Sequence, residues 1–318
     1  MPDDLLPSWR PGATRDALVA FLDDVLDVPT EERVACLDND GTLWCERPSY
    51  VQLDFFVDTL RSRASEPDFV HTPEFDAILG NDTAAMGEIG LERIALALTS
   101  LCQGISPEEF TSRVRAFMSG AQHPTLGRPL LRNVYQPMLE LIDALRRRDV
   151  TVTIVTGGGT EFVRAVSQQL YGVPPEAVVG TLIGYELVRG EDGAPRLLRT
   201  GRPAAAANEG AAKVSKIQSQ LGRRPLLVAG NSGGDREMLE WAASGPGPAL
   251  ALLIDHDDAE REFAYVSRAE TFAEPEPITE VGARLGWTVV SMASDWETVF
   301  PSAAPALGGR TPMRRVVG

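Results

Sequence analysis

Apolar residues recur along this chain at two spacings, and the two spacings alternate. Period-2 and continuous apolar runs predict strands at residues 33–37, 151–155, 225–229, 249–254 and 287–292. Spacings of three and four residues predict helices at 16–26, 135–147, 161–170, 210–221 and 235–242. Strands that alternate with helices favour an α/β fold with a Rossmann-like, doubly wound parallel sheet.

A long helical block interrupts this alternation after the first strand. It contains predicted helices at 51–60, 83–102 and 107–118, the last with Ser106 as N-cap and Pro107 at its first position. An insertion at the carboxyl edge of a strand lies over the ligand site. We therefore expect a helical cap at 46–129 and a catalytic core at 1–45 and 130–301. Within the core, residues 178–200 are expected to form strands joined by a turn, and residues 302–318 are expected to be a disordered tail.

Composition narrows the function classes. The formal net charge of −15 disfavours nucleic acids and anionic membrane surfaces as partners, because both require basic patches. Three cysteines make a disulfide framework unexpected, and the start of the chain has no signal-peptide pattern, so we expect a cytoplasmic protein without a membrane span. The sequence leaves the oligomeric state open.

Two carboxylates stand where the first predicted strand ends. Asp38 and Asp40 are two residues apart, so an extended backbone projects both side chains the same way. Buried acids are costly unless they bind a cation or perform chemistry. In an open α/β sheet, ligands bind at this edge.

Other polar groups follow later predicted strands. Thr156-Gly157-Gly158-Gly159 follows the strand at 151–155, and Asn231 to Asp235 follows the strand at 225–229. Of the 30 basic residues only Lys213 and Lys216 are lysines, which indicates a need for a compact ammonium. We expect Lys213 at the site and Lys216 as its solvated neighbour.

These residue types suit phosphoryl transfer. A carboxylate can attack phosphorus, and a second acid can protonate the leaving oxygen and then activate water. A hydroxyl and glycine amides at a helix N-terminus can hold phosphate oxygens, and Mg²⁺ takes a few oxygen ligands together with substrate phosphate. A calcium loop and the Asp-x-Asp of a glycosyltransferase are weaker readings, because the first lacks further ligands and the second leaves Thr156, Lys213 and Asp235 unexplained.

The order and spacing of these motifs resemble the haloacid dehalogenase-like phosphohydrolase superfamily over roughly 30–45 and 130–295. Further strings look like a bacterial branch akin to phosphoserine and phosphorylcholine phosphatases: Leu43-Trp44-Cys45-Glu46, His123-Pro124, Tyr135 to Glu140, Gly157 to Phe162, and Gly230-Asn231-Ser232. The second acid, Asp40, argues against dehalogenation, because the dehalogenases of the superfamily lack it. The resemblance implies Mg²⁺-dependent hydrolysis of a small phosphorylated metabolite through an aspartyl-phosphate.

The resemblance also implies roles for individual residues. Asp38 is the nucleophile and a Mg²⁺ ligand, and Asp40 is the acid/base that binds Mg²⁺ through its backbone carbonyl. Lys213 pairs with Asp38 and phosphate. The residues that bind the phosphate are Thr42, Thr156, Gly157 and Gly158. The remaining metal ligands are Asn231 and Asp235. Asn231 is a departure, since many relatives have Asp there, and a neutral amide contributes less charge.

Several residues and functions stay open at this point. Trp44 and Glu46 either face the substrate or serve as a packing residue and a surface acid. His123 is expected at a hinge and His256 on the surface. A phosphotransferase that uses the same aspartyl-phosphate, and a non-catalytic protein that binds a phosphate ligand, remain alternatives to hydrolysis.

Overall fold

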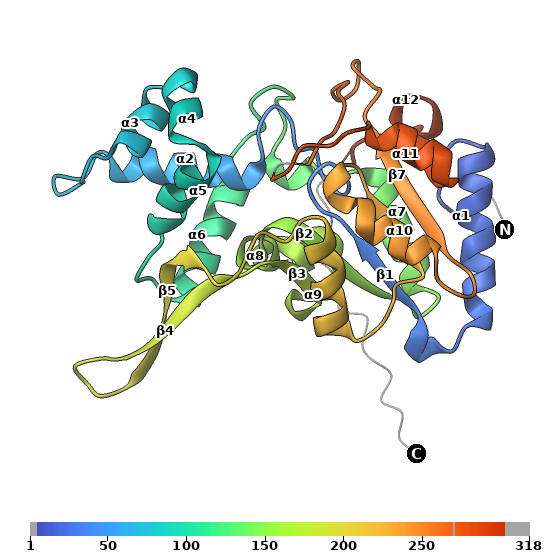
Figure 1. Ribbon diagram of the computed structural model, residues 1–318, viewed down its shortest axis with the longest axis horizontal. Coiled ribbons are helices and arrows are strands. Elements are labelled where there is room, and N and C mark those ends of the chain that lie inside the picture. The colour runs from blue at the N-terminus through green and yellow to red at the C-terminus, as the bar shows by residue number, and fades with distance from the viewer. Residues whose placement is uncertain (1–4, 270, 303–318) are drawn as a thin grey trace.

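A six-stranded parallel sheet forms the centre of the protein (Figure 1). The computed structural model describes residues 5–269 and 271–302. The strands run in the order β3-β2-β1-β6-β7-β8, with bounds Val178–Thr181, Thr151–Gly159, Val34–Leu37, Leu227–Gly230, Leu250–Asp255 and Thr288–Ser291. The predicted α/β fold is therefore confirmed. The predicted tail lies outside the described residues from residue 303 onwards.

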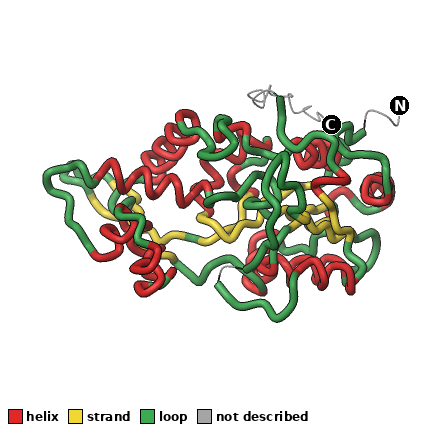
Figure 2. The backbone as a smooth tube through the Cα atoms, turned by 90° about the horizontal axis from the view of Figure 1, so that it is seen from above, coloured by secondary structure: helices red, strands yellow, loops and turns green. Residues whose placement is uncertain are grey.

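Helices cover both faces of this sheet (Figure 2). Alternate side chains of β1 point to opposite sides, so Ala35 and Leu37 belong to one apolar cluster and Val34 and Cys36 to the other. The first cluster includes residues of α1 (Ala13–Asp24), α7 (Gln136–Arg146) and α8 (Thr160–Tyr171). The second includes residues of α9 (Ala211–Leu221), α10 (Arg236–Ala243) and α11 (Ile278–Leu285), and the short α12 (Met292–Asp295) follows β8.

Five α-helices lie between β1 and α7 in the chain, as the helical block predicts. They are α2 (Val51–Arg63), α3 (Pro73–Leu79), α4 (Thr83–Ile89), α5 (Leu91–Ser100) and α6 (Pro107–Gly120). The Ser106 side chain accepts from the Glu109 amide at 3.2 Å, so the predicted N-cap is confirmed. The single helix predicted over 83–102 is wrong, because Gly90, with φ of +89°, ends α4 and precedes α5.

An antiparallel hairpin stands apart from the main sheet and lies against the inserted helices (Figure 1). Its strands are β4 (Ile183–Arg189) and β5 (Pro195–Pro203). The Arg199 amide donates to the Ile105 carbonyl at 2.9 Å, and the Arg199 guanidinium lies 3.7 Å from the centre of the Phe110 ring. Arg199 also forms an ion pair with Glu161 in the first turn of α8. This arginine therefore joins the hairpin to the inserted helices and to the core.

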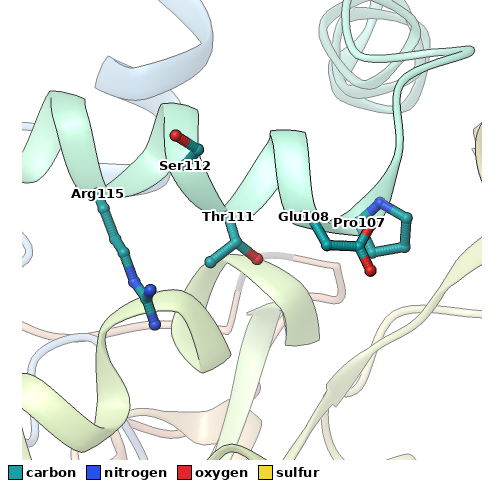
Figure 3. Close-up of a pocket in the computed structure, with 5 residues that line it drawn as sticks. All are labelled: Pro107, Glu108, Thr111, Ser112 and Arg115. Carbon is teal, nitrogen blue, oxygen red and sulfur yellow. The ribbon is translucent and has the colours of Figure 1, made fainter.

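A hollow of about 400 Å³ lies along α6, where Arg115 extends toward α8 (Figure 3). The Arg115 Nε donates to the Ala165 carbonyl at 2.9 Å. None of the five lining residues is among the predicted site residues: Pro107, Glu108, Thr111, Ser112 and Arg115. Within residues 5–269 and 271–302, no helix has the length and apolar character needed to cross a bilayer.

Candidate active site

The carboxyl ends of β2, β1 and β6 meet at one edge of the sheet. Leu37 at the end of β1 is in register with Ile154 of β2 and Ala229 of β6. The residues that follow Leu37 and Ala229, and those at the end of β2, therefore emerge side by side. The predicted convergence of Asp38, the Thr156 loop and the Asn231 loop is confirmed by this register.

Lys213, near the start of α9, joins two of these strand ends. Its Nζ lies 2.5 Å from Asp38 Oδ1 and 2.5 Å from Asp235 Oδ1, and it donates to the Val155 carbonyl at 3.1 Å. Burial alone lowers the pKa of Lys213, but the charges and hydrogen bonds of Asp235 and Asp38 outweigh it and raise this pKa. The lysine therefore stays cationic between two carboxylates.

The Asp38 carboxylate lies in a surplus of negative charge. Burial raises its pKa well above the usual value, and the nearby charge of Asp235 adds to this rise, whereas Lys213 opposes it. One ammonium faces two carboxylates here, with Asp40 close behind. Such a surplus of buried negative charge favours a bound cation.

Asp40 is held by three donors. Trp44 Nε1 donates to its Oδ1 at 2.8 Å, while Asn39 Nδ2 and Thr156 Oγ1 lie 3.3 and 3.5 Å from its Oδ2. Burial raises the pKa of Asp40, and these hydrogen bonds only partly oppose the rise. Trp44 is 1 % exposed, so it packs in the core and also orients Asp40. The raised pKa favours the protonated carboxyl that a general acid requires.

Glu46 is buried, so the interpretation of it as a surface acid is wrong. Its Oε1 accepts from Asn231 Nδ2 at 3.2 Å and from the Tyr265 hydroxyl at 2.8 Å. Burial raises the pKa of Glu46 to about 7. Thr42, also buried, lies with its Oγ1 3.4 Å from Asn231 Oδ1. Glu46 and Thr42 therefore both contact Asn231.

Gly41 makes this arrangement sterically possible. Its φ is +71°, a conformation that favours glycine. A Cβ at this position would lie 2.0 Å from Asn231 Nδ2 and 2.9 Å from the Glu46 carboxyl carbon. The glycine of the Asp-x-Asp-Gly motif therefore lets the first strand end approach the third.

The oxygen donors at this edge fit Mg²⁺. Among the described residues no hydrogen-bond donor contacts Asp38 Oδ2. The Asn231 Nδ2 contacts Glu46 and Ser267, so the Asn231 Oδ1 points away from these two residues. With the Asp40 carbonyl, these are the carboxylate, amide and main-chain oxygens that a hydrated Mg²⁺ accepts. In the described ranges, no group of three or more His, Cys, Asp or Glu side chains has metal-binding geometry, so the fit depends on amide and main-chain oxygens.

Asp235 is already engaged by protein donors. Its Oδ1 contacts Lys213, and its Oδ2 accepts from the amides of Asn231 at 3.0 Å and Ser232 at 3.1 Å. This carboxylate therefore shapes the loop that carries Asn231 and fixes Lys213. The structure favours Asn231 over Asp235 as the side chain that faces a metal.

The glycines at the end of β2 contact a residue that the sequence did not single out. The Gly158 amide donates to Thr156 Oγ1 at 3.0 Å, and the Gly157 carbonyl accepts from Thr181 Oγ1 at 2.7 Å. The Gly159 amide donates to Oε1 of Gln52, in the first turn of α2, at 2.8 Å. No local motif marks Gln52, which reaches the site through the insertion.

His256 is buried, so the predicted surface position is wrong. The segment after β7 returns beneath the catalytic loop, where His256 Nε2 lies 2.8 Å from the Gly41 carbonyl oxygen. Its Nδ1 lies 3.3 Å from Glu262 Oε2, and its ring stacks on Tyr265 with centroids 4.4 Å apart. His256 therefore supports the turn that carries Asp40.

His123 holds the chain where the inserted helices return to the core. Its Nδ1 accepts from the amides of Thr125 and Leu126, so its Nε2 carries the proton and donates to the Arg47 carbonyl at 2.7 Å. The expected hinge position is consistent with these contacts. Lys216, expected in solvent, is partly buried and donates to the carbonyls of Gly180 and Ala206.

The family model of haloacid dehalogenase-like hydrolases matches residues 35–240. The chain belongs to this hydrolase family. The matched range begins within β1 and includes the strand ends that carry Asp38, Thr156 and Asp235, together with Lys213. No curated protein is significantly similar in sequence to this family member.

Solved structures share the fold of this hydrolase at low sequence identity. A functionally unknown protein from Anaerococcus prevotii is 14% identical, with a TM-score of 0.52, 90% of this chain covered and 94% of the other. A protein of unknown function from Bordetella pertussis is 18% identical, with a TM-score of 0.49 and coverages of 81% and 98%. A probable phosphoserine phosphatase from Vibrio cholerae is 14% identical, with a TM-score of 0.43 and coverages of 86% and 64%. At these identities the likeness concerns the fold alone.

Proposed function

We propose that this hydrolase is a Mg²⁺-dependent phosphomonoesterase that acts on a small phosphorylated metabolite through an aspartyl-phosphate. The observation that carries the proposal is the placement of Asp38. Its Oδ1 is bonded to Lys213 at 2.5 Å, and its Oδ2 contacts no protein donor among the described residues. One oxygen is thus held by a cation while the other is available to attack phosphorus.

In the first step, Asp38 Oδ2 forms a bond to phosphorus and the bond from phosphorus to the leaving oxygen breaks. Asp40 donates its proton to that oxygen and releases the alcohol. In the second step, Asp40 takes a proton from water, whose oxygen bonds to phosphorus as the aspartyl-phosphate bond breaks. Inorganic phosphate leaves and Asp38 is regenerated.

The surrounding residues stabilise charge and position the two acids. Lys213 and the Thr156 loop offset the charge of the phosphoryl oxygens, and Trp44 aims Asp40. The Asp38 carboxylate, the Asp40 carbonyl and Asn231 Oδ1 would hold Mg²⁺, which supplies further positive charge when it is bound. A cytoplasmic location is part of the same proposal and is supported by three buried cysteines that are free thiols.

Phosphate release from p-nitrophenyl phosphate and a panel of small phosphate monoesters tests this proposal. We expect release with Mg²⁺ and none with EDTA. Asp38→Asn should lose at least about 1,000-fold in kcat, because it lacks the nucleophile, while keeping the thermal unfolding midpoint near that of the wild type. Full activity in Asp38→Asn would overturn the mechanism, and the ranking of esters would indicate the substrate.

A further inference from the structure

Gln52 brings a side chain from the inserted helices to the catalytic edge of the core. It is the second residue of α2, in the first segment of the insertion, whereas its partner Gly159 is the last residue of β2. The 2.8 Å hydrogen bond from the Gly159 amide identifies the accepting atom as Oε1. This bond fixes the orientation of the Gln52 side-chain amide: Oε1 contacts Gly159, and the two hydrogens are on Nε2.

The Gln52 amide lies beside the groups proposed to handle the phosphoryl group. The point where a Cβ on Gly158 would lie is 2.9 Å from Gln52 Oε1, 3.2 Å from Thr156 Oγ1 and 3.8 Å from Asp40 Oδ2. A Cβ on Gly159 would lie 2.9 Å from Gln52 Nε2. The two glycines therefore leave the space that lets Gln52 approach Thr156 and Asp40.

The Nε2 group of Gln52 keeps its hydrogens for another molecule. It carries two donors, and among residues 5–269 and 271–302 no acceptor lies within hydrogen-bond distance of it. Gln52 is only partly buried, so another molecule can reach these donors. The non-bridging oxygens of a phosphate monoester, the substrate of the proposed reaction, are acceptors that suit these two donors.

We propose that Gln52 is a substrate-binding residue whose Nε2 donates to a non-bridging oxygen of the phosphate monoester. This inference rests on the proposed function and deepens it. Oε1 accepts from Gly159 and places the amide, while Nε2 contacts the dianionic group next to Thr156. Substrate binding thus adds a bond between the inserted helix and the phosphoryl group held by the core. The ligand class is a phosphate monoester, with inorganic phosphate as the simplest member.

Two substitutions separate the donor from the acceptor. Gln52→Glu keeps an oxygen for the Gly159 amide but replaces the donor with a second anionic oxygen, whereas Gln52→Leu removes both. A hydrogen bond to a charged group corresponds to roughly a 10- to 100-fold change, so we expect Gln52→Leu to lose that much in kcat/KM. Gln52→Glu should lose more, because its charge also repels the dianion. Gln218→Glu, which adds the same charge at an exposed position of α9, should match the wild type.

Binding of inorganic phosphate, measured by calorimetry with Mg²⁺ present, gives a readout that needs no turnover. Its Kd should rise at least about 10-fold in Gln52→Glu relative to the wild type and Gln218→Glu. Thermal unfolding should show all four proteins folded. If Gln52→Leu unfolds, Gln52→Glu still decides, because it keeps the acceptor for the Gly159 amide and lacks only the donor.

Two results would overturn the assignment. Wild-type kcat/KM and phosphate Kd in Gln52→Glu, with losses only in Gln52→Leu, would show that Gln52 serves merely as an acceptor that ties α2 to the loop. Wild-type values in both variants would show that it has no role in binding. Failure of the proposed function looks different: the wild type would release no phosphate from any ester, while the phosphate Kd would still report on Gln52.

Discussion

Replacing His256 tests whether the buried segment after β7 positions the catalytic turn. The two ring nitrogens of His256 lie near oxygen atoms, with Nε2 2.8 Å from the Gly41 carbonyl and Nδ1 3.3 Å from Glu262. Burial raises the pKa of Glu262, but the hydrogen bond and charge of His256 outweigh it and lower this pKa. His256 and Glu262 therefore interact in the interior, beneath the residue that follows Asp40.

His256→Leu breaks this pair and leaves one charge buried. Removing one partner of a buried ion pair costs about 3–5 kcal/mol. Glu262 keeps the Tyr135 hydroxyl at 2.9 Å and the Phe263 amide at 2.7 Å, so we expect the lower end, about 3 kcal/mol. Because Gly41 adjoins Asp40, a shift of the turn of about 1 Å should also lower kcat roughly 100-fold, with KM changed less than threefold.

Urea unfolding and steady-state kinetics at saturating Mg²⁺ measure these two effects. His256→Gln serves as the matched control, because its amide nitrogen can still donate to the Gly41 carbonyl while its contact with Glu262 is lost. We expect His256→Gln to recover at least about tenfold of the lost kcat but only part of the lost stability. Equal kcat values for the wild type and His256→Leu would refute the positioning role, and equal kcat in both variants would show that the bond to Gly41 is not what matters.

Two further predictions follow from buried charges. Lys213→Met should abolish phosphate release and lower the free energy of unfolding by about 3–5 kcal/mol in urea titrations, because it leaves Asp38 and Asp235 buried without their cation; unchanged stability would contradict the pairing. Burial lowers the pKa of His123, so the unfolded chain binds its proton first, and the free energy of unfolding should fall as pH drops below about 6.5. Urea titrations between pH 7.5 and 5 should show a smaller fall for His123→Gln, and identical slopes would exclude His123 as the source.

The strands and the motif residues at their ends could be predicted because local sequence determines them. Four consecutive buried apolar residues form β1, and the polar residues after β1, β2 and β6 meet because parallel neighbours in register end at the same edge. Asp38 and Lys213, which are 175 residues apart, could be paired in advance only through the spacing of the family motifs. The break at Gly90 was missed because apolar periodicity continues across it, and α11 was not predicted.

The second layer of the site depends on contacts that no local pattern encodes. His256 stands in an acidic stretch, Asp255-His256-Asp257-Asp258, that reads as solvated, yet the chain returns under Gly41 and buries the ring against Tyr265. Gln52 opens an ordinary helix, and only the fold brings its amide to Gly159. Motif residues carry the reaction, so their type and spacing are constrained by chemistry, whereas a supporting residue needs only to reach one backbone group. Many sequence positions can meet that weaker requirement, and the three-dimensional path of the chain selects among them.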